Sequence, residues 1–314
     1  MSVLKGKKLL CATDLSHPSL ETERSALQFA RTVDSRLTFV HVVEDAPLFL
    51  GPMPFEEGQK WQQLETRYRG ELLAQTLIRA EHSLSPLRTD GEQFQVVVKL
   101  GNAESEILSL VNDSKEPPAA VIVGRHHHSR IYSAFFGSVA QRIVEQSQIP
   151  VVVLPLSETF EQKKFEHIGL ATTLRQDAQI PESILMDFLS SNQKKDRVAH
   201  IAHCFERVAP GYSGFETTDA YVTYRELELI YDMAESRLDH AVQEKVRQIT
   251  ERGFHAQGHL LVGNAEQELL HFVKDNKIDV IIFGRHQHEG QHRFHLSRLL
   301  RHFIRKTTCM TIIG

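Results

Sequence analysis

An acidic residue and two glycines stand where apolar runs of this sequence end or where a helical pattern begins. Asp14 follows the first apolar run, and a carboxylate there can accept hydrogen bonds from a ribose hydroxyl or an adenine amine. Gly124 ends a later apolar run, where a missing side chain lets the backbone approach a ligand. Gly137 and Ser138 open a helical pattern and can offer N–H groups, a hydroxyl and a positive dipole end to a phosphate.

Each of these positions also has a purely structural interpretation. Asp14 can form an Asx-turn or cap the following helix, and taken alone it favours that interpretation. Gly124 and Gly137 can serve ordinary turns, and a Gly-Ser pair by itself is weak evidence for a ligand site.

Histidine is unusually frequent, since the chain has 18 of them and two segments hold many of these. Zinc binding is one interpretation, because His288, His292 and His295 would share a face if their segment were helical. Apart from Glu289, no acidic or cysteine residue stands beside them at a recognised zinc spacing, so we expect no bound metal. The clustered histidines are His126, His127, His128, His286, His288, His292, His295 and His302.

Residues 284–314 are rich in basic side chains and contain a single acid, Glu289. Arg298, Arg301 and Arg305 have i, i+3 and i+7 spacing, which would place them on one helical face. Such a face can bind a phosphate, an acidic head group or a partner protein, or it can be a solvated face whose cations suit a helix C-terminus. Nucleic-acid binding is not expected, because no aromatic stacking platform accompanies the cations. The basic residues are Arg285, Arg293, Arg298, Arg301, Arg305 and Lys306.

The elements that must position these residues occur twice. The segment Leu100–Leu108 matches Val262–Leu270, and Val121–His126 matches Ile281–His286. Two further blocks match in the same order, all at an offset of about 160 residues, which is the signature of a tandem duplication. We therefore predict domain 1 over residues 1–157 and domain 2 over residues 158–314, joined by a polar linker.

Within each half, short apolar runs alternate with amphipathic helical stretches. This alternation predicts parallel strands joined by right-handed crossovers, so each half is expected to be a doubly wound α/β domain with a mostly parallel five-stranded sheet. Ligands of such sheets bind outside the carboxyl ends of the strands. The predicted strands are Lys8–Thr13, Leu37–Val43, Phe94–Lys99, Ala120–Gly124, Pro150–Leu154, Ile168–Thr172, Val198–Cys204, Gln257–Leu261, Val280–Gly284 and Cys309–Ile313.

Composition limits the classes of function. The 314 residues carry 36 Lys and Arg against 40 Asp and Glu, a net charge of −4 that gives no case for nucleic-acid or anionic-membrane binding by the whole chain. Cys11, Cys204 and Cys309 lie far apart, which indicates a reducing compartment. No apolar run approaches a membrane span, and Met1–Lys8 is too polar for a signal peptide, so we expect a cytoplasmic protein.

In combination, these motifs resemble the universal stress protein family in its tandem two-domain bacterial form, over essentially the whole chain. The resemblance implies a fold similar to the adenine nucleotide alpha hydrolases, with the two halves paired as a pseudo-dimer through their last strands, Val151–Leu154 and Thr311–Ile313. An apolar last strand without a partner would be an unpaired edge prone to association, so some pairing is expected on physical grounds as well. The motifs that carry the resemblance are Ala12-Thr13-Asp14, Phe39-Val40-His41-Val42, Gly101-Asn102-Ala103, Val123-Gly124, Gly137-Ser138 and Val151-Val152-Val153-Leu154-Pro155.

The resemblance implies an adenine nucleotide, ATP or a relative, in domain 1. Asp14 and Val42 would contact the adenosine, Val42 through its backbone, and Gly124 would let the chain pass close to the ribose and phosphates. Magnesium can accompany the nucleotide.

The phosphates would be held by Gly137, Ser138 and Val139 through N–H groups and the hydroxyl. His127 stands where the family pattern has its second glycine, and its Cβ can obstruct a triphosphate while its ring can also reach a phosphate.

Domain 2 departs much further from the family pattern. Thr173 replaces the acidic residue, Cys204 stands in place of Val42, and Ser297-Arg298 stands in place of Gly-Ser. Ordinary ATP binding is not expected there, although the fold can persist without the site.

Three functions stay open. The chain can be a stress-response module in which a nucleotide stabilises one conformation for a protein partner, with domain 2 serving structure, a partner or an acidic ligand. It can be an interaction or scaffold protein without nucleotide, or a slow nucleotide hydrolase. No Walker lysine follows the glycines and no nucleophile–base pair can be placed, so efficient catalysis is not expected. Association of two chains as a homodimer stays open.

Overall fold

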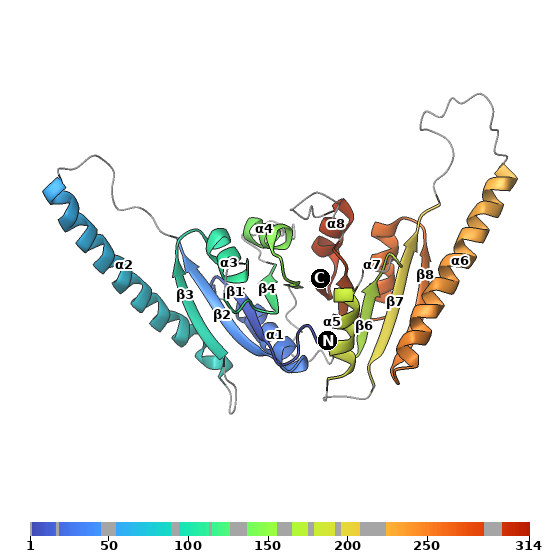
Figure 1. The fold of residues 1–314 in the computed structure, drawn as a ribbon, viewed down its shortest axis with the longest axis horizontal. Coiled ribbons are helices and arrows are strands. Elements are labelled where there is room, and N and C mark those ends of the chain that lie inside the picture. Colours follow the sequence, from blue (N-terminus) through green and yellow to red (C-terminus); the bar gives the residue numbers. More distant parts are fainter. Residues whose placement is uncertain are drawn as a thin grey trace, which may run out of the picture.

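The computed structural model describes residues 2–16, 19–44, 55–88, 94–112, 115–125, 137–155, 165–174, 179–191, 196–207, 224–285 and 297–314. These residues form one continuous ten-stranded sheet with helices on both faces (Figure 1). The predicted boundary between residues 157 and 158 lies outside them, and we keep it as a working division into domain 1 and domain 2.

The elements alternate as the repeat predicts, with each predicted strand present to within two residues. Domain 1 contains β1 Lys8–Thr13, α1 Ser19–Thr32, β2 Arg36–Val43, α2 Phe55–Leu84, the short 3-10 helix η1 Ser85–Leu87, β3 Phe94–Leu100, α3 Ala103–Asn112, β4 Ala120–Gly124, α4 Ser138–Gln146 and β5 Val151–Leu154. Domain 2 contains β6 His167–Ala171, α5 Gln179–Leu189, β7 Val198–Phe205, α6 Tyr224–Thr250, β8 His255–Val262, α7 Ala265–Asp275, β9 Val280–Phe283, α8 Arg298–Lys306 and β10 Met310–Ile313.

The sheet has the strand order β3-β2-β1-β4-β5-β10-β9-β6-β7-β8. Neighbouring strands within each half are parallel, as the crossover pattern predicts. β5 and β10 pair antiparallel, with Val151 opposite Ile313 and Val153 opposite Thr311. The doubly wound fold and the pairing of the two last strands are therefore confirmed.

Helices from both halves bury the two faces of the sheet. One core cluster gathers residues of α1, α2, α5 and α6, and the other gathers residues of α3, α4, α7 and α8. The central strands β4, β5, β9 and β10 are buried along their whole length, which explains their unbroken Val- and Ile-rich sequences. The long helices α2 and α6 lie on the two outer flanks, and both begin beyond the same side of the sheet (Figure 1).

The first core cluster is continuous from one half to the other. Phe188 of α5 lies between Phe29 of α1 and Phe165, with ring centroids 5.8 and 6.1 Å apart. The buried carboxylate of Asp187 accepts hydrogen bonds from the backbone N–H groups of Val3 and Leu4 at 2.8 and 2.7 Å. The start of domain 1 is thus fastened to a helix of domain 2.

Two arginines also cross between the halves, in opposite directions. Arg125, directly after β4, donates to the carbonyl oxygens of Ile304 and Thr307 at the C-terminal end of α8, the second at 2.9 Å. Its counterpart Arg285, after β9, donates to the carbonyl oxygens of Ser147 and Ile149 behind α4, the second at 2.8 Å. These contacts correct the placement of Arg285 among the candidate anion-binding residues, because its guanidinium holds backbone carbonyls of domain 1.

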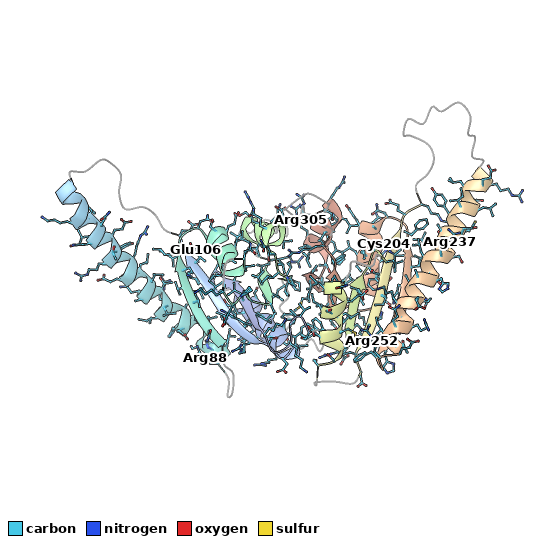
Figure 2. All side chains as sticks on the ribbon, viewed as in Figure 1. Arg88, Glu106, Cys204, Arg237, Arg252 and Arg305 are labelled. Atoms are coloured by element: carbon cyan, nitrogen blue, oxygen red, sulfur yellow. The ribbon has the colours of Figure 1, made fainter. Side chains whose placement is uncertain are left out.

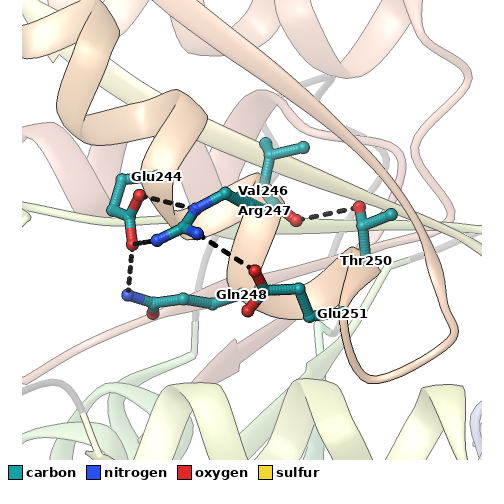
Figure 3. Close-up of polar contacts among 6 residues, drawn as sticks. All are labelled: Glu244, Val246, Arg247, Gln248, Thr250 and Glu251. Atoms are coloured by element: carbon teal, nitrogen blue, oxygen red, sulfur yellow. Dashed lines mark hydrogen bonds and ion pairs between the residues drawn. The ribbon is translucent and has the colours of Figure 1, made fainter.

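The C-terminal end of α6 is stabilised by exposed side chains (Figure 3). Arg247 donates to both carboxylate oxygens of Glu244 and to Glu251, and Gln248 also donates to Glu244. These hydrogen bonds lower the pKa of Glu244. Solvent and salt screen such exposed i, i+3 and i+4 pairs, so they support the helix locally and do not hold the domains together.

Replacement of Phe188 should test whether the shared core holds both halves. Phe188→Ala removes a fully buried ring between the two domains, and we expect a loss of about 3–5 kcal/mol in the free energy of unfolding. Chemical denaturation followed by fluorescence and circular dichroism would measure it. The control Leu229→Ala, at a side chain 58% exposed on α6, should cost under about 1 kcal/mol. A loss in Phe188→Ala no larger than in this control would contradict a shared core.

Candidate functional site

Three neighbouring strands carry the predicted adenosine-binding residues to one edge of the sheet. β1 lies between β2 and β4, and the pairing of Thr13 with His41 sets the ends of β1 and β2 at the same level. Asp14, Val42 and Gly124 therefore lie at the carboxyl ends of adjacent strands, where ligands of this fold class bind. Figure 2 shows Glu106 near the carboxyl ends of the domain 1 strands and Cys204 near those of the domain 2 strands, with Arg88 and Arg252 near the opposite ends.

The turn after β1 is held by two side chains. Asp14 accepts a hydrogen bond from the N–H of Ser16 at 2.9 Å, which is the Asx-turn that the sequence allowed. Thr13 accepts from the N–H of Leu15 at 3.0 Å, and Leu15 has a φ of 56°, in the left-handed region. That conformation costs a non-glycine residue of order 1 kcal/mol, so the surrounding contacts must impose it. The turn fixes the half-buried Asp14 carboxylate at the sheet edge.

Beneath this turn, Thr13 is held from two sides. Its hydroxyl donates to the carboxylate of Glu23 on α1, a side chain only 1% exposed. The Nδ1 atom of His41 lies 2.9 Å from the Thr13 carbonyl oxygen. Helix α1 and strand β2 thus both brace the residue that precedes Asp14.

Domain 2 repeats the same turn without the acid. Thr172 accepts from the N–H of Leu174 at 3.0 Å, Leu174 has a φ of 62°, and His203 Nδ1 lies 2.8 Å from the Thr172 carbonyl oxygen. The turn is therefore a property of the fold in both halves. The residue that the turn presents differs between the halves, Asp14 in domain 1 and the exposed Thr173 in domain 2.

Gly124 has a packing reason to be glycine. A Cβ at this position would lie 2.7 Å from Cγ2 of Thr22 on α1, closer than real Cβ contacts allow. At the equivalent Gly284 the nearest atom, in Pro181, would lie at an ordinary 3.5 Å. Close packing of α1 thus explains the domain 1 glycine before any ligand is considered.

The N-termini of α4 and α8 differ in how their N–H groups are used. The N-cap of α4 is Gly137, with a φ of −59°, and no side chain of the described residues caps this helix. A Cβ added at Gly137 would meet no atom within 4 Å. In α8 the N-cap is Ser297, whose hydroxyl accepts from the N–H of Leu300 at 3.2 Å. Within the described part of the chain, no side chain accepts from the first N–H groups of α4, whereas Ser297 accepts from one such group of α8.

The remaining predicted residues divide between described and undescribed parts of the chain. Ser138 is exposed at the first turn of α4, and Val139 is partly buried against the core. Val42 is also partly buried there, which leaves its backbone as the part that can meet a ligand. His127 lies outside the described residues, as do the other histidines of its segment and those of residues 286–295.

The two halves of the chain match one family of known proteins. The universal stress protein family matches residues 6–155 and again residues 185–313. The chain belongs to this family. A universal stress protein of Methanocaldococcus jannaschii is 25% identical over 152 residues, which cover 47% of this chain and 81% of that protein.

Solved structures share the tandem architecture of this universal stress protein. A universal stress protein from Archaeoglobus fulgidus superposes with a TM-score of 0.62 at 15% identity, covering 99% of this chain and 97% of that one. A functionally unknown protein from Pseudomonas aeruginosa superposes with a TM-score of 0.54 at 10% identity, covering 98% and 92%. At these identities the likeness concerns the fold, and it extends over both halves.

The Gly-Asn-Ala-Glu repeat of this universal stress protein has a structural role. Gly101 has a φ of 146° and donates its N–H to the Val43 carbonyl, and Asn102 accepts from the N–H of Ser105 at 3.1 Å. Gly263 and Asn264 make the same contacts in domain 2, with a φ of 141° and an Asn264 contact to the N–H of Gln267 at 3.3 Å. The motif ends a strand and begins a helix beside the site in each half.

Cys204, which replaces Val42 in domain 2, is a protonated thiol at neutral pH. Burial, with a smaller contribution from the charge of Glu268, raises its pKa to about 11. Without thiolate character it is a poor nucleophile and metal ligand. Across the ranges that the structure describes, no group of three or more His, Cys, Asp or Glu is arranged to hold a metal, and no helix is long and apolar enough to cross a membrane.

A row of three histidines crosses the sheet of domain 2, and no sequence motif predicts it. His200 Nε2 lies 3.0 Å from His167 Nδ1, and His200 Nδ1 lies 3.1 Å from His259 Nε2. Phe272 of α7 covers the rings of His200 and His259 at centroid distances of 6.3 and 5.0 Å. These histidines stand on three different strands, so sequence spacing carries no signal of the row.

The stability of domain 2 should fall in acid because of this row. Burial, followed by the nearby His259 and His167, lowers the pKa of His200 from 6.5 to about 4. The folded state favours neutral imidazole, so the stabilisation is complete above pH 6.5 and is lost as the pH falls toward 4, by roughly 2–3 kcal/mol. We expect His200→Gln to lose less free energy of unfolding between pH 7 and 4.5 than the wild type. The control Leu229→Ala, at an exposed side chain without a titrating group, should keep the wild-type slope, and equal slopes in all three proteins would contradict the assignment.

The two glycines of domain 1 should differ in how much stability an added methyl group costs. Gly124→Ala forces its Cβ against Thr22 and should cost about 1–3 kcal/mol of unfolding free energy without ligand. Gly137→Ala adds a Cβ to open space at a φ of −59°, so it should cost under about 1 kcal/mol, the small loss expected because alanine is a weaker N-cap residue than glycine. Denaturant titration of both variants measures the difference, and a Gly137→Ala loss equal to that of Gly124→Ala would refute this division of roles.

Proposed function

We propose that this tandem universal stress protein binds an adenine nucleotide, ATP or a relative, at the carboxyl edge of domain 1. The observation that carries the proposal is the contrast between the helix termini at equivalent edges. α4 begins at Gly137 with open space and no side-chain cap among the described residues, whereas Ser297 caps α8. The first arrangement suits an anionic ligand and the second does not.

The adenosine end of the nucleotide would lie at the ends of β1 and β2. Asp14, held by its Asx-turn, would accept hydrogen bonds from the adenosine, and the backbone of Val42 would contact the base. Domain 2 has neutral Thr173 and Cys204 at these positions, so the acceptor and its charge are particular to domain 1.

The phosphates would lie at the start of α4. N–H groups of Ser138 and Val139 and the exposed Ser138 hydroxyl would donate to them, and Gly137 leaves room for their approach. Gly124 would contribute a close backbone, and His127, between these glycines in the sequence, would contact or limit the terminal phosphate. Magnesium would accompany the nucleotide as a counter-ion.

Domain 2 would then serve structure and partner recognition. Its exposed Arg298, Arg301 and Arg305 on α8 offer positive charge to an acidic ligand or protein, with Arg298 already 3.8 Å from Glu266. Nucleotide occupancy of domain 1 would favour one conformation for such a partner, as expected for a stress-response module.

A copurification experiment tests the proposal. Mass spectrometry of the gently denatured protein should detect an adenine nucleotide, and calorimetry with ATP and magnesium should show binding to the stripped protein. Asp14→Ala should weaken binding at least about tenfold, because a charge-assisted hydrogen bond is worth roughly 1.5–3 kcal/mol. Gly137→Val should also weaken binding, because its branched side chain would occupy the open space through which the phosphates approach. Thr173→Ala, the matched position in domain 2, should bind like the wild type.

Two further results bear on the proposal. Asp14→Asn keeps a side-chain oxygen for the Asx-turn, so a loss of affinity in this variant would reflect the missing charge and not a disturbed loop. No copurified nucleotide together with flat calorimetry would refute nucleotide binding and leave the interaction-protein function in its place.

A further inference from the structure

Helix α4 is held at its two ends by different domains. Its N-terminus, at Gly137 and Ser138, is the proposed phosphate-binding end. Its C-terminal end is held by domain 2, because the guanidinium of Arg285 donates to the carbonyl oxygens of Ser147, the C-cap residue, and Ile149. With nine residues, α4 is about 13 Å long, so its two ends move as one rigid unit.

Arg285 is itself fixed to the sheet of domain 2. Its N–H donates to the Gly314 carbonyl at 2.7 Å, and the N–H of Gly314 donates to the Phe283 carbonyl at 2.9 Å. Burial lowers the pKa of Arg285 to about 10, so the side chain stays cationic at neutral pH. A cation at a helix C-terminus and an anion at its N-terminus each have the opposite sign to the partial charge of that terminus. Both contacts therefore stabilise the helix, and each supports the other.

We infer that Arg285 is a positioning residue for the phosphate-binding end of α4, so that domain 2 completes the nucleotide site of domain 1. This inference rests on the proposed function. Arg285 fixes where α4 sits along its axis, and that position decides whether the N–H groups of Ser138 and Val139 meet the phosphates. The residue acts through α4 and makes no contact with adenosine.

Comparison of ATP with adenosine separates this role from a general loss of structure. Calorimetry on the full chain should show that Arg285→Met weakens ATP binding about five- to tenfold and adenosine binding less than twofold. Arg285→Lys, which retains the positive charge, should recover part of the ATP affinity. The ratio of the two affinities is the decisive quantity, because a merely destabilised domain would lose both ligands together.

Arg197→Met supplies a matched control. Arg197 is 5% exposed and donates to the Phe188 carbonyl and the Ser191 hydroxyl, all within domain 2 and away from α4. This variant removes a similarly placed guanidinium and should keep the wild-type ratio of ATP to adenosine affinity. An Arg285→Met ratio equal to that of Arg197→Met would overturn the inference while nucleotide binding by the wild type stood.

A measurement on the wild-type protein covers the case in which Arg285→Met fails to fold. Hydrogen–deuterium exchange with and without ATP should show slower exchange at the amides of Arg285 and Gly314 when ATP is bound. Protection confined to domain 1 would overturn the inference. If neither ATP nor adenosine binds the wild type, the proposed function fails, and the inference fails with it.

Discussion

The antiparallel pairing of β5 with β10 is the contact on which the rest of the molecule depends. Both strands are four residues long and buried at every position, so each half-sheet alone would end at an apolar, unpaired edge. Pairing removes both edges at once and produces a single ten-stranded sheet. It also brings α1 against α5, where Phe29 and Phe188 share one core, and it places the loops after β4 and β9 near helices of the opposite half. The interdomain arginine contacts exist only because this pairing sets them within reach.

This pairing explains how domain 2 can keep the fold while its side chains at the sheet edge depart from those of domain 1. The elements that build the sheet edge occur in both halves: the left-handed Leu15 and Leu174, and the strand-ending Gly101 and Gly263. They hold turns and begin helices whether or not a ligand is bound. Among the described residues, the two halves differ at this edge in side chains that do not carry the fold, such as Asp14 against Thr173 and Gly137 against Ser297. Loss of a site therefore does not imply loss of the domain.

The strands and the duplication could be predicted from the sequence, because buried parallel strands leave continuous apolar runs and a repeat leaves matched motifs. The pairing of the last strands was implied by the family resemblance and supported by the apolar edge that an unpaired strand would leave. Contacts between distant residues could not. Arg285 looked like one cation among several, since its acceptors Ser147 and Ile149 stand more than 130 residues away. Gly124 suggested a ligand, while the structure adds that a Cβ there would collide with Thr22, which no local pattern encodes. At Asp14 the sequence allowed a turn or a ligand contact, and the turn that forms is compatible with both.

The exchange of arginines is symmetric in geometry but not in consequence. Arg125 donates hydrogen bonds to backbone carbonyls at the C-terminal end of α8, and Arg285 does the same at the C-terminal end of α4. Burial lowers the pKa of both guanidinium groups. At the far end of α8, however, Ser297 already satisfies the Leu300 N–H, so Arg125 positions a helix terminus that has less need of an anion. At the far end of α4 no side chain of the described residues does the same. On the proposed function, the contact of Arg285 with α4 positions the nucleotide site of domain 1, whereas the contact of Arg125 with α8 positions no equivalent site in domain 2. This difference gives the second copy a reason to remain attached.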